Sequence, residues 1–269
     1  MRALAVTPVL VLFVAAATPA FADDGPPLIA DVLAMDETGG RQLAVTFADE
    51  TRRRAMEHAA TALGSQAGLE RRGWEIARLL DRYSRQLHRI YRFRDLMLRE
   101  SGFMVQPPVL AETRDAFLLA RDQTQAAAAG RVVTILVSEK LVSAVPSWTD
   151  FLIRTWPEPA VPAAVLFPRS LEEETLWEAR VREGWEVGRR LADEIFRDDL
   201  DRLNGIFTGL ILWHRLHLAG MVTAPVIGTR EVAVAGGGET LRIAERFVAI
   251  DRAASLVSDP AAWQAVVTP

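Results

Sequence analysis

A long amphipathic pattern in residues 176–230 constrains the fold of this chain more than any other feature. Apolar residues recur there at helical spacing: Trp177, Val181, Trp185, Leu191, Ile195, Phe196, Leu200, Leu203 and Phe207. This spacing predicts one helix long enough to span a domain, ended by Gly220 and followed by an extended segment near Pro225. Gly184 and Gly188 lie one turn apart, and we expect them to contact another helix, because glycine lets two backbones approach closely.

A second helical pattern occupies residues 49–98, with Asp49 as a plausible N-cap. Its first half has one face of small and apolar residues, namely Met56, Ala59, Ala60, Leu63 and Ala67. Gly64 and Gly68 are again four residues apart, which resembles a small-residue contact. Arginines cover the other side of this pattern, and we interpret that basic face as solvent-exposed.

Extended segments are predicted after each helical pattern. Gly102 is expected to stop the first helix, and Pro107 and Pro108 then impose an extended turn. A helix over residues 115–129 is an open alternative to the first predicted pair of strands, which residues 126–130 would link. The predicted strands are residues 109–117, 131–137, 231–235, 240–244 and 246–250, with a hairpin around the triple glycine at 236–238.

The two helix-and-strand segments resemble each other, which predicts an internal duplication of about 115 residues. The matched positions are Gly73-Trp74 with Gly184-Trp185, Gly102 with Gly220, Met104-Val105 with Met221-Val222, Leu141 with Leu256, and Trp148 with Trp263. The predicted fold class is therefore α+β and predominantly helical, with two long amphipathic helices each followed by short strands that cover a shared core. The related halves, residues 49–150 and 170–269, are joined by a Pro-rich bridge.

The N-terminal region carries the pattern of a secretory signal peptide. Residues 1–22 contain Arg2, an apolar run and the cleavage pattern Ala20-Phe21-Ala22. Residues 23–48 predict a flexible lead-in, and residues 49–269 a single domain. The chain has no cysteine, so an exported form must be held by its core without disulfides.

No catalytic constellation stands out, and a binding or scaffold role follows by elimination. His214 and His217 are three apart on a helix and could reach one metal ion, but no further His or Cys lies nearby, so we expect no metal site. Asp198, Asp199 and Asp201 could hold an acid–base pair, although a solvated helix face is the simpler interpretation. The triple glycine lacks the lysine and hydroxyl of a phosphate loop, and no basic block indicates nucleic acid.

A set of ordered motifs resembles the DotC family, called TraI in I-type conjugation systems. The matching residues include Gly73, Trp74, Gly102, Pro107, Pro108, Trp177, Gly184, Trp185, Gly188, Phe207, Gly209, Gly220, Met221 and Pro225. The resemblance implies a structural subunit of the outer-membrane core complex of a type IVB (Dot/Icm) secretion machine. It further implies DotD-like and DotH-like partners in a ring-shaped assembly, with neither enzymatic activity nor a cofactor.

The chain departs from the family pattern in two places. Members usually carry a lipid-modified cysteine, which this chain lacks, so attachment to the outer membrane would depend on partners. Gly205-Ile206 also replaces a charged Arg-Asp pair. Two other functions stay open: a periplasmic small-ligand binding protein that closes over a cleft at the Pro-rich bridge, and a hydrolase that uses His214 or His217.

Overall fold

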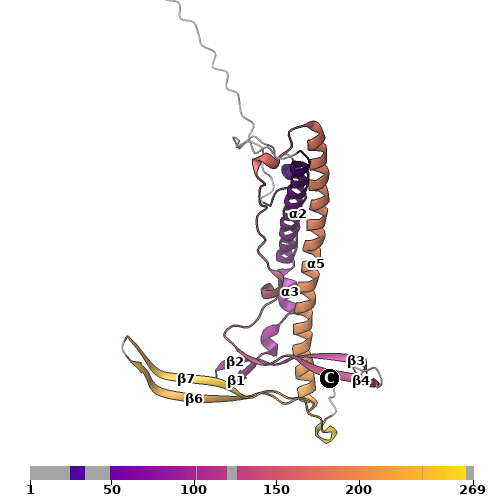
Figure 1. The fold of residues 1–269 in the computed structure, drawn as a ribbon. Helices are drawn as coiled ribbons and strands as arrows, with labels where there is room; N and C mark the ends of the chain where they lie inside the picture. The colour runs from indigo at the N-terminus through magenta and orange to yellow at the C-terminus, as the bar shows by residue number, and fades with distance from the viewer. Residues whose placement is uncertain (1–24, 34–48, 101, 120–125, 238, 265–269) are drawn as a thin grey trace, which may run out of the picture.

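The computed structural model describes residues 25–33, 49–100, 102–119, 126–237 and 239–264. Figure 1 shows a tall stalk of two long helices, α2 (Asp49–Arg82) and α5 (Leu171–Leu218), with strands gathered at its lower end, which we call the foot. The predicted α+β class, with two long helices each followed by strands, is confirmed.

The N-terminal predictions fall mostly outside the described residues. The predicted signal peptide at residues 1–22 lies there entirely, as does much of the predicted lead-in. The described part of the lead-in contains a short helix, α1 (Ile29–Leu33), which packs against the upper ends of α2 and α5. Its Val32 is fully buried among α2 and α5 side chains, so this part of the lead-in belongs to the packed structure.

The two long helices are parallel and touch through glycine, along a line that we call the seam. A Cβ atom on Gly64 would lie 2.2 Å from the carbonyl oxygen of Val181, and one on Gly188 would lie 2.0 Å from that of Ser65. Gly68 and Gly184 make equivalent contacts with the opposite helix. Each helix therefore supplies a pair of glycines four residues apart, and the predicted close contact of Gly184 and Gly188 with a helix is confirmed.

Ion pairs cross the seam in both directions. Arg52 of α2 pairs with Glu173 of α5, and Arg180 of α5 pairs in return with Glu57 of α2 at 3.0 Å. Lower down, the pairs are Arg72 with Asp193 (2.8 Å) and Arg189 with Glu75 (3.2 Å). Apolar side chains fill the space between these pairs, so the charges flank the contact and fix its register.

The first helix ends earlier than predicted. After α2 come α3 (Ser84–Ile90), the 3-10 turn η1 (Phe93–Leu96) and the strand β1 (Leu98–Glu100). Phe93 is buried and meets the ring of Phe207 on α5 edge-on at 5.2 Å. Burial of Phe93 against α5 takes the chain off its helical path, so Gly102 stops no helix. It forms, with φ +84°, the turn between β1 and β2 (Phe103–Gln106).

Two long β-ribbons leave the foot in opposite directions (Figure 1). The N-terminal ribbon pairs β3 (Val109–Leu119) with β4 (Ala126–Val137), and the C-terminal ribbon pairs β6 (Val226–Gly237) with β7 (Thr240–Arg252). The alternative helix over residues 115–129 is therefore wrong, and the predicted link at 126–130 belongs to β4. Residues 246–250, predicted as a separate strand, continue β7. A short β5 (Lys140–Val142) joins β2 and β1 in a small sheet.

The two ribbons are alike, but the segments before them differ: Gly102 lies in a β-turn and Met104-Val105 in β2, whereas Gly220 ends α5. Val109 pairs with Val137 and Val226 with Arg252, and a register shift follows each pair immediately.

In the helices, Gly184 and Gly188 contact α2 at Thr61, Ser65 and Leu69. Gly73, which the repeat matches with Gly184, instead contacts Trp156 of the bridge, so the two glycines have different surroundings. Nor do the strands cover the helices. They gather at the foot instead, because the parallel helices already bury each other.

The Pro-rich bridge returns the chain from the foot to the top of the stalk. It follows α4 (Thr149–Leu152), includes a short 3-10 turn, η2 (Ala164–Leu166), and ends where Ser170 caps α5. The indole of Trp156 covers Gly73, and Gln66 accepts a 2.7 Å hydrogen bond from the backbone N–H of Ala160. Because two parallel helices need a connection as long as themselves, the prolines supply an extended segment for that length.

Ser170 and Glu173 cap the start of α5. The Ser170 hydroxyl accepts a hydrogen bond from the backbone N–H of Glu173 at 3.3 Å. The Glu173 carboxylate accepts from the backbone N–H of Arg169 (2.8 Å) and also pairs with Arg52. The hydrogen bond from Arg52 lowers the pKa of Glu173, so the cap also ties α5 to α2.

The close contact at the seam predicts that a Gly→Ala substitution has opposite effects on stability at two glycines of α5. Gly188→Ala should lower the free energy of unfolding by about 1–3 kcal/mol, because the new methyl group must push the backbones apart. Gly205→Ala is the matched control, since a Cβ there meets nothing within 4 Å. That variant should gain up to about 1 kcal/mol from helix propensity. Chemical denaturation of both variants provides the measurement, and equal effects would contradict the seam.

Candidate interaction surface at the foot

The lower end of α5 is closed by Gly220. Gly220 has φ +68° and donates its N–H to the carbonyl of His217, while the Met221 N–H donates to that of Leu216 at 2.9 Å. These are the two hydrogen bonds of a Schellman motif, which needs a residue that tolerates the left-handed conformation. The backbone therefore leaves α5 in a fixed direction, and this direction sets the position of the C-terminal ribbon.

The two histidines of α5 hold the foot together and do not converge on a metal position. His214 Nε2 donates to the carbonyl of Leu96 at 3.0 Å, and His217 Nδ1 donates to that of Val222 at 3.0 Å. Both rings lie against the buried indole of Trp213, one edge-on and one stacked. Within the described residues, no group of three His, Asp or Glu side chains could hold a metal ion.

The N-terminal ribbon packs on α5 through another glycine. A Cβ on Gly209 would lie 2.5 Å from a methyl carbon of Val109 and 2.6 Å from the carbonyl oxygen of Leu110. Val109 is only 1% exposed and Leu110 2%. The base of this ribbon is therefore held tightly against the helix, which fixes the direction in which the ribbon leaves the foot.

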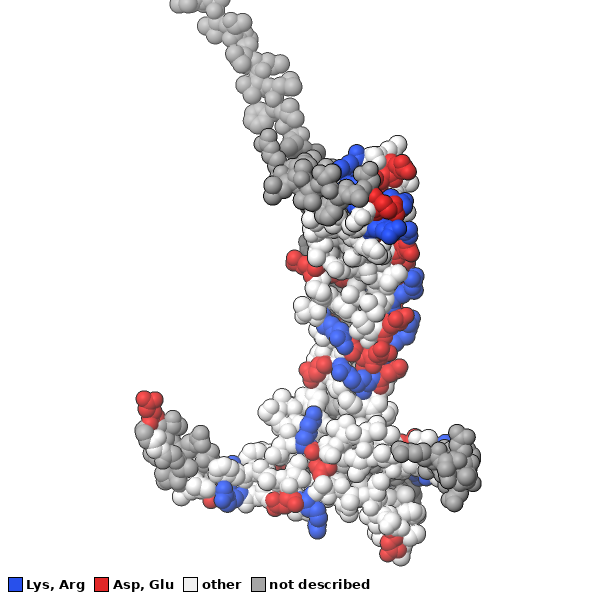
Figure 2. Space-filling view, in the orientation of Figure 1, with Lys and Arg blue, Asp and Glu red and all other residues white. Residues whose placement is uncertain are grey.

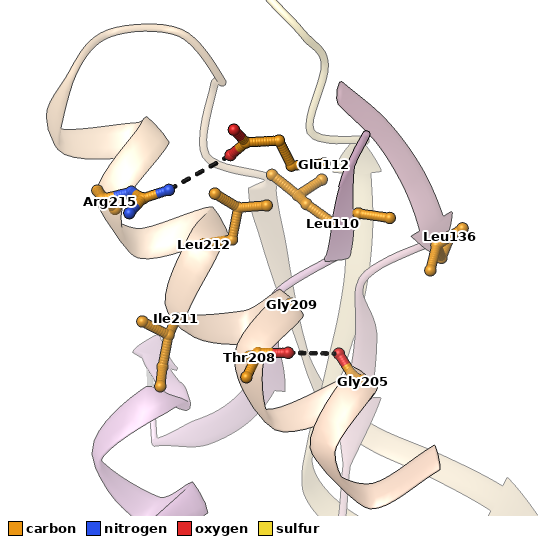
Figure 3. A pocket seen from close by; sticks show the side chains of 10 residues that line it. Leu110, Glu112, Leu136, Gly205, Thr208, Gly209, Ile211, Leu212 and Arg215 are labelled. Atoms are coloured by element: carbon orange, nitrogen blue, oxygen red, sulfur yellow. Dashed lines mark hydrogen bonds and ion pairs between the residues drawn. The ribbon is translucent and has the colours of Figure 1, made fainter. Parts of the chain in front are cut away.

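An open groove lies beside this contact, and Figure 3 shows it from close by. Its volume is about 490 Å³. We call it the foot groove, and its lining residues include Leu110, Leu136, Gly205, Ile211 and Leu212. Leu136 is 62% exposed because it is the extra residue at the register shift of β4, and Ile211 is 44% exposed. Gly205 leaves open space where a side chain would otherwise stand.

Arginines surround a single carboxylate at one end of the foot groove. Glu112 of β3 pairs with Arg114 (3.3 Å), Arg131 (3.1 Å) and Arg215 (3.4 Å). Loss of hydration disfavours the charged carboxylate, but the arginines outweigh that effect and hold the pKa of Glu112 below its usual range. The cluster has more positive than negative charge, so this end of the groove favours an acidic partner.

Among the described residues, no helix packs on the base of the C-terminal ribbon as α5 does on the N-terminal one. Val226 occupies the position that corresponds to Val109, yet it is 39% exposed, because α5 ends before reaching it. Further out, Ile243 is 72% exposed and Phe247 43%, with the guanidinium of Arg230 5.1 Å from the Phe247 ring centre. A two-stranded ribbon is marginally stable by itself in water, so these exposed apolar side chains indicate a docking surface.

A buried carboxylate on α5 attaches the bridge to the lower stalk. Its burial corrects one prediction. Asp199, predicted to lie on a solvated face with Asp198 and Asp201, is only 5% exposed. Arg154 of the bridge donates two hydrogen bonds to it, one of them 2.8 Å long, and Arg202 adds a third. The hydrogen bonding from Arg154 lowers the pKa of Asp199. This carboxylate serves the structure rather than acid–base chemistry.

The remaining motif residues have structural positions. Trp177 and Trp185 are buried in the upper stalk, and Trp177 packs on Phe167 of the bridge. Trp74 differs from Trp185, since it lies partly exposed between Arg71 and Arg78. Pro107 and Pro108 are buried between β2 and β3, and Pro225 is buried before β6. Sequence patterns missed the foot groove, because its walls come from segments about 100 residues apart.

Charges of both signs gather along the α5 edge of the stalk, whereas Figure 2 shows much of the foot without charge. No helix in the described part of the chain is long and apolar enough to cross a membrane.

A family model for "Type IV secretory system, conjugal DNA-protein transfer" (TraI) matches residues 50–265. No curated protein matches the chain.

The ion pair between Asp199 and Arg154 predicts that the stability of the fold depends on pH. Asp199→Asn should lower the free energy of unfolding at pH 7 by about 1–3 kcal/mol, because charged hydrogen bonds are lost. Since the folded pKa is depressed, the stabilisation is present above the unfolded value of about 3.9 and disappears as pH falls through the folded pKa. As the pH is lowered, the free energy of unfolding of the variant should therefore fall less than that of the unmodified protein, as measured by denaturation curves. Exposed Asp198→Asn is the control, expected within about 0.5 kcal/mol of the unmodified protein.

Proposed function

The chain belongs to the TraI family of type IV secretory systems, which act in conjugal DNA–protein transfer, and on that premise we propose that it is a structural subunit of the outer-membrane core complex. In this proposal the complex is of type IVB, and the chain assembles with DotD-like and DotH-like partners into a ring. The subunit itself performs no chemistry and needs no cofactor. Its contribution is to hold the assembly at a fixed geometry.

The observation that supports this role is the contrast between the rigid stalk and the uncovered foot. Glycine contact and ion pairs on both sides of the seam hold the helices in one register. The foot, by contrast, exposes the C-terminal ribbon and the foot groove. A part that is stiff at one end and open to partners at the other suits a repeated building block.

For the small-ligand alternative, the part of the bridge at Trp156 offers no cleft. That hypothesis expects a cleft between two lobes at the Pro-rich segment. The bridge instead lies along the helices, and the cavity lined by Gly73, Trp156 and Asp199 has a volume of only about 10 Å³. This volume is too small for any ligand larger than water. His214 and His217, the candidate residues of the hydrolase alternative, each hydrogen-bond to a backbone carbonyl, which supports a structural role for them in this proposal.

Export is part of the proposal. We expect the mature protein to begin at Asp23 and to reside in the periplasm, held at the outer membrane through its partners, since the chain has no cysteine for a lipid. N-terminal sequencing of the protein recovered from the cell envelope tests this point. An intact Met1 on envelope-derived protein would contradict it.

Transfer assays test the central claim. Deletion of the gene should abolish conjugal DNA transfer, and complementation should restore it. Replacing residues 228–249 with a short Gly-Ser loop should leave the helical circular dichroism and the melting of the stalk near normal, because the ribbon contributes no side chain to the upper core. The same variant should lose co-purification with DotD-like and DotH-like proteins. Normal transfer in the deletion strain would refute the proposed function.

A further inference from the structure

The lower half of the stalk carries opposite net charge on its two sides. Arg72 of α2 pairs with Asp193 of α5 at 2.8 Å. Further down, the hydroxyl of Tyr91 donates to the side-chain oxygen of Asn204 at 2.7 Å. From the first contact to the second, the α2–α3 segment contains five arginines and two acidic residues, whereas the α5 segment contains five acidic residues and two arginines. One height of the stalk is therefore basic on one side and acidic on the other.

Three arginines at this height form what we call the basic face: Arg82 at the end of α2, and Arg85 and Arg89 on α3. All three are exposed, and none has an ion-pair partner among the described residues. Arg82 lies two residues from buried Leu80, and the other two lie two residues from Leu87, which packs on the same core. Two helical residues turn through about 200°, so the arginines point away from that core.

Three carboxylates of α5 form the acidic face, namely those of Glu194, Asp198 and Asp201. They too are exposed, and the described part of the chain offers none of them an ion-pair partner. Ala192 and Leu203 are completely buried in the core that holds Leu80, and they lie two residues from Glu194 and Asp201, respectively. Asp198 is four residues from Glu194 and shares its side of the helix. The acidic face therefore also points away from the core.

The two faces point in opposite directions, because the core to which both turn their backs lies between α5 and the α2–α3 segment. Each face covers seven residues of helix, or roughly 10 Å. Figure 1 shows both ribbons leaving the stalk below α3, so the ribbons do not cover these faces at their own height. One copy thus presents matching surfaces on opposite sides. Such an arrangement is heterologous, and repeated contacts lead to a closed ring or an open filament.

We propose that the basic face of one copy pairs with the acidic face of a second copy that stands beside it in the same orientation. This inference rests on the proposed function and names the contact that joins neighbouring stalks. The equal height of the two faces selects the orientation, because upright neighbours bring opposite charges to the same level. An inverted neighbour would bring its acidic face to the upper stalk, where Arg53 and Arg54 already pair with Glu50.

Chemical cross-linking tests the contact directly, because the chain contains no cysteine of its own. Gln86→Cys and Arg197→Cys place an exposed thiol beside each face and leave all six charges in position. The two variants are made in differently tagged copies, expressed in the same cells and treated with a short bifunctional thiol reagent. The expected product is a covalent dimer that contains both tags. The matched control replaces Gln86→Cys with Val161→Cys, which is 65% exposed on the bridge and should give no such dimer with Arg197→Cys.

Charge reversal in these cysteine variants tests whether the faces recognise each other by charge. One set of substitutions reverses the basic face: Arg82→Glu, Arg85→Glu and Arg89→Glu. A second set reverses the acidic face: Glu194→Arg, Asp198→Arg and Asp201→Arg. Either set alone should lower the yield of the mixed dimer about tenfold or more, because like charges then meet. Both sets combined in every copy should restore the yield, since the two faces are complementary again.

A control for total charge reverses three arginines outside the two faces. Arg94→Glu, Arg99→Glu and Arg252→Glu change exposed residues that have no ion-pair partner in the described structure. The yield should stay within about twofold, because salt screens charges at that separation. Circular dichroism checks the folding of every variant. If a reversed variant unfolds, neutral substitutions (Arg→Gln, Glu→Gln and Asp→Asn) replace the reversal and should also lower the yield.

Several results would overturn the contact. These are absence of the mixed dimer, an equal yield with the Val161→Cys control, no recovery in the folded combined variant, or linkage of Gln86→Cys mainly to a different envelope protein. If deletion of the gene abolishes transfer but no mixed dimer forms, the contact fails and the proposed function stands. If the mixed dimer forms as expected but deletion leaves transfer normal, the contact stands and the proposed function fails.

Discussion

The contact between two helix backbones at the seam is the constraint on which the rest of the molecule depends. Gly64, Gly68, Gly184 and Gly188 let the backbones of α2 and α5 touch at these positions, where no Cβ atom would fit. Because the helices run in the same direction, the chain must return along their whole length, and the Pro-rich bridge serves that need. Parallel helices also deliver both strand-forming segments to the same end, so both ribbons emerge from one foot.

At the foot, packing fixes the base of each ribbon and leaves the outer parts open. Trp213, with a histidine on each side, anchors the last turns of α5, and Gly209 admits the N-terminal ribbon onto the helix. Gly220 then ends the helix at a fixed angle. The C-terminal ribbon, in contrast, keeps apolar side chains such as Ile243 and Phe247 exposed.

Local chemistry made much of this structure predictable. Helical spacing located α5, Gly220 marked its end, and the glycines around residue 237 indicated the C-terminal hairpin. Long-range packing decided the rest. Nothing local shows which residues of α5 contact Gly64 and Gly68, or that Phe93 packs against α5. Likewise, the sequence does not distinguish Asp199 from its exposed neighbour Asp198, because only the folded structure brings Arg154 of the bridge to it. The foot groove also forms only when segments far apart in the sequence pack together.

The parallel arrangement also gives the stalk an electrical direction. Peptide dipoles of α2 and α5 add instead of cancelling, so their positive ends coincide at the top and their negative ends point toward the foot. Glu50 near the start of α2 and Glu172, Glu173 and Glu174 in the first turn of α5 place compensating negative charge at that positive end. Neighbouring stalks that stand upright side by side would share this orientation, and an inverted copy would be distinguishable by charge alone. An assembly of stalks aligned in this way would have one electrostatic direction before any specific contact forms.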